Sequence, residues 1–563
     1  MAEGTFDAII VGSGFGGSVL AYRLQEAGLR VCLLERGKAW PPGSFPRSPA
    51  DARTGLLWDP SAGLHGLFNV WSFKSFEAIV ASGLGGGSLV YSNVSIRKDE
   101  KWFVQEDART GEYEHWPVKR ADLDPHYDRV ERILNVQPYP ADHAPYNATP
   151  RTHAFRDAAA RLNVPFSTPP LAVSFSNVDQ LPGLSLPLIE NSPNLHHAQR
   201  YTCRLCGECN IGCNYGSKNS LDYTYLSLAR RAGADIRTRC EVRSFEPLGD
   251  GQGFQVRYVS HEGVADGEKR DTSTLLLHTL KAGRLILSAG ALGTPYLLLK
   301  NRASFPALSE RLGTRFGANG DMIAFASECR NVDAQSYRRV DATYGPAITA
   351  ALRFPDAVDG AAAGARGHYI EDAGYPQLFN WLIEAANFPG NTRRLTGLLL
   401  RRIRARLSGR VDSDISADVG ALLGRAELSS SSMPLLGMGR DASDGRMTLQ
   451  RGLLEIATTH RSDAYFDALI ADMDAIARSL NAKLVASPTW SLGRRTATVH
   501  PLGGAPMGRD AKEGVVDAWG RVFNYPGMVI ADGSVMPGAI GANPSLTIAA
   551  FADRVADGIL DTP

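Results

Sequence analysis

The sequence predicts an α/β fold in which a Rossmann-like, dinucleotide-binding domain carries an inserted α+β domain. Three observations lead to this prediction. A βαβ unit with a glycine-rich turn lies at the N-terminus, and glycine-rich strand-turn-helix patterns recur at 281–301 and 500–560. Between about 325 and 485, strand-like and helix-like segments are mixed, without glycine-rich turns of this kind. An inserted domain is therefore expected in the middle of the chain.

The N-terminal unit starts with FDAIIV (6–11), a β-branched apolar run typical of a strand buried on both faces of a parallel sheet. The turn GSGFGG follows, and SVLAYRLQEAG predicts a helix that Gly28 ends. The run LRVCLLERG then predicts a second buried strand. These elements together form a βαβ unit.

A dinucleotide-binding motif lies inside this unit. Gly12, Gly14 and Gly17 form G-x-G-x-x-G between the strand and the helix, where backbone N–H groups at a helix N-terminus can approach a pyrophosphate. Glu35 closes the second strand, where a carboxylate can accept hydrogen bonds from both ribose hydroxyls. The acid argues against a 2′-phosphate and hence against NADP. The spacing does not separate NAD from FAD.

The remaining patterns divide the chain into three parts. LDYTYLSLARRAG predicts a helix, CEVRSFEP and GFQVRYVS predict strands, and LILSAGALGTPYLLLKN predicts a second strand-turn-helix. We expect 1–324 to form the N-terminal and central parts of the cofactor domain, with a cysteine-rich loop at 203–213 and some segments of the inserted domain. We expect 325–485 to form most of the inserted, substrate-binding domain, and 486–563 to complete the cofactor domain.

The composition is that of a globular protein from a reducing compartment. The chain has 563 residues, 44% of them hydrophobic, and a net charge of +1, so the charge balance gives no reason to expect a nucleic-acid partner. Four of the seven cysteines lie within 203–213, unlike a secreted disulfide framework. The acidic start MAEGTFDAII has no export signal, and no apolar run is long enough to span a bilayer. These features predict a cytoplasmic protein.

Three further stretches resemble the GMC oxidoreductases, a family of FAD-dependent alcohol oxidases and dehydrogenases, and most of all their bacterial cholesterol-oxidase-like branch. They are GLGGGSLVYSN (83–93), LILSAGALGTPYLLL (285–299), and HPLGGAPMG with ADGSVMPGAIGANPSLTIAAFADR (500–554). The resemblance covers the cofactor domain and favours FAD over NAD. It also implies non-covalent FAD, because no histidine stands where some relatives attach the flavin.

The same resemblance implies the cofactor site. Several regions supply it: the N-terminal glycine turn with its acid, the second glycine loop, a strand whose backbone meets the adenine, and the segments around the second and third strand-turn-helix patterns. The expected residues are Gly12, Gly14, Phe15, Gly16, Gly17, Glu35, Arg36, Gly85, Gly86, Gly87, Ser88, Asn93, Val242, Ala289, Gly290, Asp532, Gly533, Asn543 and Pro544.

The expected chemistry is removal of a hydroxyl proton with transfer of the carbinol hydride to flavin N5. That reaction needs a base with a pKa near the working pH, which suits histidine. His500 in VHPLGG matches the family's catalytic histidine, and Asn543 in GANPSL matches its asparagine partner, which hydrogen-bonds the substrate oxygen. The alternative for Asn543 is a turn-forming role before Pro544, and the ANPSL context favours the active-site role.

The resemblance implies a hydrophobic alcohol as substrate, sterol-like or long-chain, with oxygen or a redox partner as electron acceptor. Sterol-oxidising relatives also place a carboxylate over the substrate ring for isomerisation. Glu371 and Asp372 are candidates by position alone, so isomerase activity stays open. Two other functions stay open as well: a non-redox flavoenzyme of the same fold, of lyase or photodecarboxylase type, and a flavin-bearing electron-transfer module without a substrate.

The motif CRLCGECNIGC places Cys203, Cys206, Cys209 and Cys213 at the C-x2-C-x2-C-x3-C spacing of iron–sulfur proteins. No second such run exists, and Asn214 replaces the usual proline. An iron–sulfur cluster and a set of reduced thiols or disulfides are about equally compatible with the motif. Zinc is less so, because zinc sites usually split their cysteines into separated pairs.

A basic segment is a candidate for membrane contact. NTRRLTGLLLRRIRARLSGR (391–410) contains seven arginines and no acid, with leucine and isoleucine spaced for one helical face. Such a helix can rest on anionic lipid or pack on its own domain with the arginines solvated. Peripheral membrane contact is therefore kept as a hypothesis.

Overall fold

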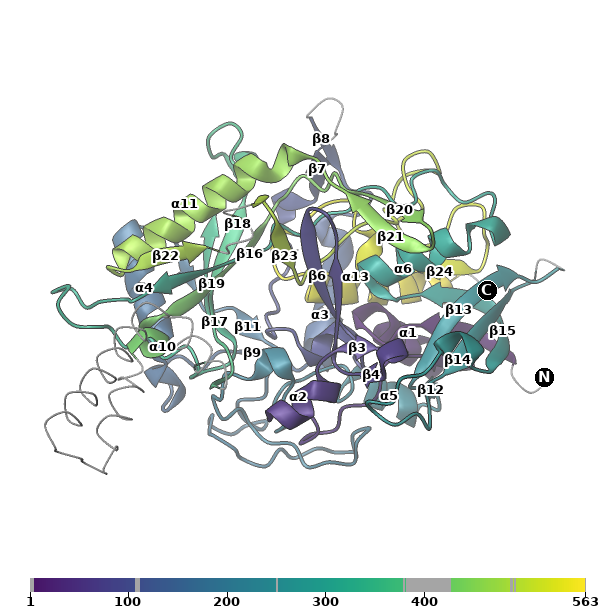
Figure 1. Ribbon diagram of the computed structural model, residues 1–563, viewed down its shortest axis with the longest axis horizontal. Helices are drawn as coiled ribbons and strands as arrows, with labels where there is room; N and C mark the ends of the chain where they lie inside the picture. Colours follow the sequence, from purple (N-terminus) through teal and green to yellow (C-terminus); the bar gives the residue numbers. More distant parts are fainter. Residues whose placement is uncertain are drawn as a thin grey trace, which may run out of the picture.

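The computed structural model describes residues 5–106, 112–249, 252–377, 427–486 and 493–561, together with residues 380 and 490. Within these ranges the chain folds around two large β-sheets, one of seven strands and one of six (Figure 1). The basic segment 391–410, for which membrane contact was expected, lies outside the described residues. In the described part of the chain, every helix is too short or too polar to cross a bilayer.

The seven-stranded sheet is the Rossmann-like part of the molecule. Its order is β12-β2-β1-β15-β14-β13, and β24 pairs with β15. The strands are β1 (Thr5–Val11), β2 (Val31–Leu34), β12 (Asp235–Arg237), β13 (Cys240–Pro247), β14 (Phe254–Ser260), β15 (Leu277–Leu287) and β24 (Met528–Ile530). Strands β12, β2, β1, β15 and β24 run parallel to one another, whereas β13 and β14 join as antiparallel strands. The prediction of an α/β fold is confirmed.

Helices from both ends of the chain cover this sheet. The helices α1 (Phe15–Glu26), α3 (Arg120–Ile133), α5 (Tyr225–Arg231) and α13 (Ser545–Leu560) pack against one another, with α1 between α5 and α13. Helix α1 begins at Phe15, inside the glycine motif, rather than after it as the sequence predicted. The buried faces of β1 and β2 are continuous apolar runs, which fits a sheet covered on both faces.

The six-stranded sheet is antiparallel, in the order β10-β17-β18-β19-β16-β22. The strands are β10 (Phe166–Ser167), β16 (Met322–Ser327), β17 (Ile348–Phe354), β18 (His368–Ala373), β19 (Met433–Gly439) and β22 (Lys483–Ala486). Helices α4 (Pro150–Leu162) and α11 (Asp463–Ser479) pack on one face of it (Figure 1). Because successive residues of a strand point to opposite faces, the other face is left for the interior of the molecule.

Smaller elements connect the two sheets. The strands β5 (Phe68–Ser72), β6 (Phe76–Ala81) and β23 (Thr496–Thr498) form a three-stranded sheet, and β20 (Arg446–Gln450) pairs with β21 (Leu453–Ala457). Helix α6 (Gly290–Lys300) follows β15. The remaining elements are α2 (Pro49–Gly55), β3 (Trp58–Asp59), β4 (Leu64–His65), β7 (Val104–Glu106), β8 (Tyr113–His115), β9 (Gln137–Pro138), β11 (Pro170–Leu171), α10 (Glu427–Ser431) and short 3-10 turns.

Candidate active site

A large cavity of about 1190 Å³ runs between the two sheets. One end is lined by the glycine motif and the ends of the parallel strands, as expected for a ligand at the carboxyl edge of a Rossmann-like sheet. The other end is lined by β16 and β19 of the six-stranded sheet and by the β20–β21 hairpin. The glycine-lined end and the end at the six-stranded sheet therefore form one continuous space.

The glycine motif fills two distinct steric roles. A Cβ atom on Gly16 would lie 1.5 Å from the carbonyl oxygen of Ala531, and one on Gly17 would lie 2.0 Å from that of Gly12, so these glycines permit close backbone packing. Gly14 has no atom within 4 Å of its Cβ position and lines the cavity. It also caps α1, whose first turn has neither a side-chain cap nor an acidic residue. The free N–H groups there suit an anionic pyrophosphate.

Glu35 and Arg36 line the cavity at the end of β2. The carboxylate of Glu35 accepts hydrogen bonds from the Ser13 amide (3.0 Å), the Ser13 hydroxyl (2.7 Å) and the Gly37 amide (2.8 Å). Arg36 donates to the Asn69 side chain at 3.1 Å and lies over the Trp58 ring, and burial lowers the pKa of its guanidinium. Ser13 therefore fixes the orientation of Glu35, a contact that the motif alone did not indicate.

The second glycine loop lies directly on the first. A Cβ atom on Gly86 would be 2.7 Å from the Cα of Gly14, and Gly87 faces open space on the cavity wall. Gly85 adopts a φ of 113°. The hydroxyl of Ser88 donates to the Gly85 carbonyl at 2.7 Å and accepts from the Leu221 amide at 3.0 Å. Ser88 thus holds the shape of the loop and does not face the cavity.

Asp532 joins the C-terminal segment to the start of α6. Its carboxylate accepts hydrogen bonds from the Gly290 amide (2.8 Å), the Ser534 amide (2.8 Å) and the Thr294 hydroxyl (2.5 Å). Burial raises the pKa of Asp532 above its ordinary value. The expected residues Ala289, Gly290, Asp532, Gly533, Pro544 and Val242 all line the cavity.

His500 lines the cavity and is oriented by Asp321. Its Nδ1 lies 2.8 Å from Oδ1 of this buried aspartate. The other oxygen, Oδ2, accepts from the backbone amides of Val499 and His500 and from the Thr498 hydroxyl. Since a carboxylate accepts hydrogen bonds, Nδ1 carries the proton and Nε2 is left with its lone pair. Within the described residues, no partner hydrogen-bonds to Nε2.

Asn543 lies on the same cavity wall and contacts Glu371 of β18. The Nδ2 atom of Asn543 donates to Oε2 of Glu371 at 3.3 Å. Both side chains are buried, and the Oδ1 atom of Asn543 and the Oε1 atom of Glu371 have no protein partner among the described residues. Burial raises the pKa of Glu371 to about 8. Glu371 is therefore a neutral carboxylic acid at neutral pH, next to an amide with an open acceptor.

The neighbouring carboxylate, Asp372, points to the opposite face of β18. It pairs with Arg151 of α4 at 3.0 Å and accepts from the backbone amides of Thr349 and Ala350. The two acids that sequence reasoning treated as equal candidates are thus separated by strand alternation. Glu371 reaches the site through Asn543, and Asp372 joins the sheet to its covering helix.

One turn, Asn319–Asp321, holds both His500 and the loop of Asn543. The Asn319 side chain accepts from the Ile540 and Gly541 amides at 2.9 Å and donates to the Ala542 carbonyl at 3.0 Å. Two residues later, Asp321 contacts His500. Sequence reasoning missed Asn319 and Asp321, because no motif marks them and their partners lie far along the chain.

The pocket beyond His500 is apolar. The side chains that line it project from the interior face of β16 and β19, from the β20–β21 hairpin and from the loop beside His500: Ile323, Phe325, Pro434, Leu436, Leu453, Leu454 and Val499. The alternate residues of β16 and β19 pack in the core beneath α4 and α11. Strand alternation therefore builds the pocket and the core from the same two strands.

Some expected residues do not line the cavity. Gly17, Gly85, Ser88 and Asn93 lie behind its wall. The four cysteines of 203–213 are free thiols beside the cavity, and only Asn210 of their loop lines it.

The residues present fit an FAD molecule. Gly14 and Gly87 leave room where a Cβ atom would stand, the N-terminus of α1 offers uncapped N–H groups, and Glu35 lies at the end of the second strand. The cavity then continues past His500 into the apolar pocket. The order of its donors corresponds to an extended dinucleotide followed by a substrate.

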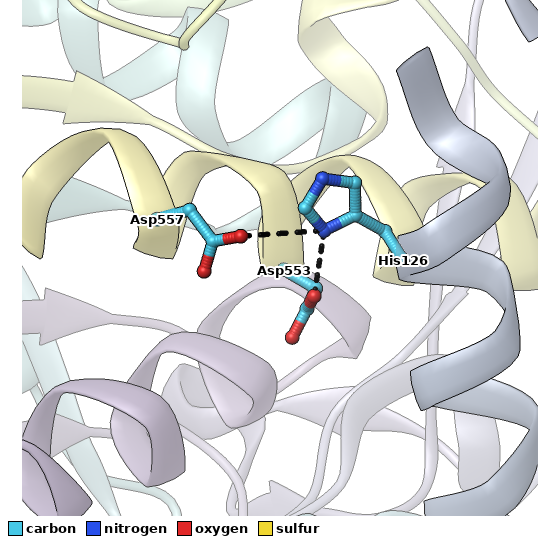
Figure 2. Close-up of side chains that lie close together, drawn as sticks. All are labelled: His126, Asp553 and Asp557. Carbon is cyan, nitrogen blue, oxygen red and sulfur yellow. Dashed lines mark hydrogen bonds and ion pairs between the residues drawn. The ribbon is translucent and has the colours of Figure 1, made fainter. Parts of the chain in front are cut away.

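A second histidine–carboxylate cluster lies away from the cavity. Nδ1 of His126, on α3, is 2.7 Å from Oδ2 of Asp553 and 3.9 Å from Oδ2 of Asp557, both on α13 (Figure 2). Arg23 of α1 and Arg129 of α3 pair with both carboxylates. The two guanidinium groups neutralise the two acids, so the cluster joins three helices instead of offering a charged site for a cation.

Comparisons with protein families and with known proteins show what this chain is similar to. GMC oxidoreductase matches at residues 194–311 and 441–552, and an NAD(P)-binding Rossmann-like domain matches at 10–41. A cholesterol oxidase of Mycobacterium tuberculosis is 31% identical over 98% of this chain and 90% of its own length. A cholesterol oxidase of Acinetobacter baumannii is 27% identical over 98% and 93% of the two chains. A long-chain-alcohol oxidase of Arabidopsis thaliana is 25% identical over 99% of this chain and 67% of its own.

Solved structures share the fold across the whole chain. Pyridoxine 4-oxidase from Mesorbium loti has a TM-score of 0.56 at 16% identity and covers 99% of both chains. A fungal aryl-alcohol oxidase has a TM-score of 0.54 at 16% identity and covers 100% of this chain and 99% of its own. At this identity the two structures bear on the fold alone.

Proposed function

Because this chain belongs to the GMC oxidoreductase family, in its cholesterol-oxidase-like branch, we propose that it oxidises a hydrophobic alcohol to the carbonyl with His500 as the base. Membership of the family makes it an FAD-dependent oxidoreductase that acts on alcohols. The non-redox alternative is not favoured, since the three curated relatives described above are all named oxidases. The identity of the base, the roles of the other residues and the substrate class are proposals.

The observation that carries the proposal is the arrangement of His500. Its Nδ1 is held by the buried Asp321 at 2.8 Å, and its Nε2 is open on the wall of an apolar pocket. Nε2 accepts the hydroxyl proton of the substrate, and the carboxylate of Asp321 stabilises the resulting imidazolium. Asn543 donates to the substrate oxygen while negative charge develops there.

FAD bound in this cavity would supply the hydride acceptor, its N5 atom. The chain's own residues hold it: Gly12, Gly14 and the N-terminus of α1 at the pyrophosphate, Glu35 at the ribose, Val242 at the adenine, and Gly87 with the Asp532–Gly533 segment along the remainder. Phe325, Leu436 and Leu454 give the wall in front of His500 an apolar surface.

The substrate class follows from the pocket. Leu436, Phe325 and Leu453 offer an apolar alcohol dispersion contacts and no hydrogen-bonding partners. The relatives are named for cholesterol and long-chain alcohols, so a sterol-like or long-chain alcohol is the proposed substrate. Oxygen is the proposed electron acceptor, with a redox partner as the alternative. A cytoplasmic location stays a prediction, as does contact of 391–410 with a membrane.

Two cofactors were expected. FAD follows from the family, whereas an iron–sulfur cluster on the four cysteines is a separate proposal, on which the comparisons do not bear.

Anaerobic mixing of the flavin-loaded protein with cholesterol, hexadecanol and glucose tests the function. We expect cholesterol or hexadecanol to bleach the flavin absorbance and glucose to leave it unchanged. The variant Asn319→Ala, which loosens the Asn543 loop without touching His500, should slow bleaching less than His500→Ala does. Absence of bleaching by every hydrophobic alcohol tried, with FAD bound, would contradict the proposal.

A further inference from the structure

The loop that carries Asn543 has little support from its own backbone. Residues 536–544 lie between the 3-10 turn η11 (Gly533–Val535) and helix α13. Within the described part of the chain, no backbone–backbone hydrogen bond involves residues 538–543. Buried backbone N–H and C=O groups need partners, so side chains from elsewhere must bind this loop. Whatever binds the loop also sets the position of Asn543.

Two buried side chains bind the loop. Asn319 binds two of its amides and the Ala542 carbonyl. Nζ of Lys98 donates to two carbonyls nearer the start of the loop, those of Ala539 (2.8 Å) and Ile540 (3.1 Å). Lys98 and Asn319 are both 0% exposed to solvent. Together they bind three carbonyls and two amides of this loop.

Hydrogen bonds to the loop hold Lys98 in place, without an ion pair. Its Nζ lies 4.3 Å from the centroid of the Trp116 ring and 5.4 Å from that of Phe103, and it forms no ion pair with a carboxylate in the described ranges. Burial lowers the pKa of Lys98 well below its ordinary value. An ammonium group has three N–H bonds and a neutral amine has two, so either form can donate to both carbonyls. The two hydrogen bonds compensate for the burial of the polar Nζ atom.

The segment 94–98 also borders the cavity. It begins directly after the second glycine loop. Val94 lines the cavity, and its carbonyl accepts a hydrogen bond from the Ser545 hydroxyl at 3.5 Å. Lys98, at the end of the segment, does not itself line the cavity. The segment therefore ties the Asn543 loop to the glycine loop.

A further contact from the same part of the chain fixes the shape of the loop. Gly541 has a φ of 86°, and a Cβ atom there would lie 2.5 Å from the Trp102 ring. Trp102 is fully buried and donates through Nε1 to Asp359 at 3.0 Å. Lys98 and Trp102 thus hold adjacent residues of the loop. A displaced loop would move the Asn543 amide, and a misplacement of about 1 Å at a reacting group costs about 10²-fold in rate.

From these contacts we propose that Lys98 is a positioning residue for the reaction. By binding the carbonyls of Ala539 and Ile540, it holds Asn543 in the place from which its amide donates to the substrate oxygen. This inference rests on the proposed function, from which it takes the role of Asn543. Lys98 lies outside the cavity lining, so its effect on the reaction passes through the loop.

Stopped-flow reduction of bound FAD by cholesterol or hexadecanol, without oxygen, tests the inference. Lys98→Met nearly keeps the length of the side chain and removes its donors. We expect the limiting rate to fall by about 10 to 100-fold, while the half-saturating alcohol concentration changes by less than about threefold. The rate falls more than binding because the hydrogen bond from Asn543 strengthens as charge develops on the oxygen. The FAD content should equal that of wild type.

A double-mutant cycle separates positioning from general damage to the fold. In an Asn543→Ala background, the addition of Lys98→Met should change the limiting rate by less than about twofold, because the group that Lys98 positions is already gone. If the two substitutions instead slow the reaction independently, so that their effects multiply, the inference is overturned.

Hydrogen–deuterium exchange of the loop gives a readout that does not depend on activity. We expect the backbone amides of 538–543 to exchange at least about tenfold faster in Lys98→Met than in wild type. Arg151→Met is the matched control, because Arg151 is also a fully buried cation that donates to backbone carbonyls, those of Ala342 (3.2 Å) and Tyr344 (2.7 Å). The control should lower stability, but loop exchange and the reduction rate per bound FAD should stay within about twofold of wild type.

An unchanged reduction rate in Lys98→Met, or an equal loss of rate in Arg151→Met, would overturn the inference and leave the proposed function standing. If Lys98→Met does not fold, Lys98→Gln takes its place, because its shorter side chain moves the donor away from both carbonyls. An unchanged rate in that variant would overturn the inference as well. Failure of the proposed function would show differently, since no hydrophobic alcohol would then bleach the flavin of the wild-type protein, and the inference would fall with it.

Discussion

Two histidine–aspartate pairs in this molecule have almost the same geometry and different surroundings. In one, Nδ1 of His500 lies 2.8 Å from Asp321; in the other, Nδ1 of His126 lies 2.7 Å from Asp553. The carboxylate in both pairs is almost completely buried. The short contact alone therefore does not identify the catalytic pair.

The difference lies in what else touches each pair. Arg23 and Arg129 pair with Asp553, and Asp557 approaches the same ring nitrogen of His126 (Figure 2). Asp321 instead receives hydrogen bonds from neutral groups, two backbone amides and a hydroxyl. Its charge remains available to His500, whose Nε2 faces the cavity. The comparison teaches that the proposed catalytic pair differs from the other pair in its open ring nitrogen and in a carboxylate that no described arginine neutralises.

The largest effect should come from removing the base. We expect His500→Ala to slow reduction of bound FAD by alcohol by roughly 10³ to 10⁴-fold, because no other described side chain at this wall offers an open imidazole. Stopped-flow absorbance of the anaerobic protein measures the rate, and FAD content should stay unchanged. His126→Ala is the matched control, and an equal loss of rate there would contradict the comparison.

Breaking the other pair should affect folding. Asp553→Ala leaves Arg23 and Arg129 with Asp557 as their remaining partner, and loss of the buried carboxylate should lower the unfolding free energy by about 1 to 3 kcal/mol. Urea denaturation followed by far-UV circular dichroism measures this loss. The rate of flavin reduction per bound FAD should stay within twofold of wild type. If Asp553→Ala reduced its flavin slowly but were as stable as wild type, catalysis would belong to the His126–Asp553 pair, which would contradict the comparison.

A smaller effect is expected when the charge of the catalytic pair is removed and its shape kept. Asp321→Asn should lower the rate by about 10²-fold, because the amide no longer stabilises the imidazolium. The same substitution at the other pair, Asp553→Asn, should leave the rate unchanged. If the two variants were equally active, the charge of Asp321 would have no catalytic role.

The smallest effect on rate is expected at Glu371. Below pH 8 the native side chain is a neutral acid, so Glu371→Gln should change the rate by about twofold or less. Stability should differ more. Because the folded pKa of about 8 lies above the unfolded value, the contribution of Glu371 is fully present below the unfolded pKa and is lost as the pH rises through 8. Denaturation at pH 5 and pH 9 should therefore show wild type losing stability relative to Glu371→Gln. If the unfolding free energies of wild type and Glu371→Gln changed by the same amount between pH 5 and pH 9, the raised pKa of Glu371 would be contradicted.

Sequence patterns place the N-terminal half of the candidate site on one βαβ unit, since the requirement there is local. Gly12, Gly14 and Glu35 stand at fixed positions of one βαβ unit, and strand, turn and helix fold from adjacent residues. The same holds for the strand-turn-helix that contains Ala289 and Gly290. The predicted helix over 221–233 is shorter in the structure, Tyr225–Arg231, because the preceding residues form turns.

The side-chain contacts of His500 and Asn543 were not predictable in the same way. Asp321 and His500 are 179 positions apart, and Glu371 and Asn543 are 172 apart. Nor did the sequence show which of two adjacent acids, Glu371 or Asp372, would face the site. That choice depends on which face of β18 is covered by α4, and a strand pattern alone does not label its faces.

The sequence by itself determined the cofactor-binding turns, the candidate base and the cysteine motif, because each is a short run whose backbone conformation or spacing is set by neighbouring residues. Only the tertiary structure decided that Asp321 orients His500, that Glu371 stays neutral beside Asn543, and that the cysteine loop borders the cavity. The physical reason is that burial, charge pairing and a common cavity wall arise only when segments distant in the sequence pack together.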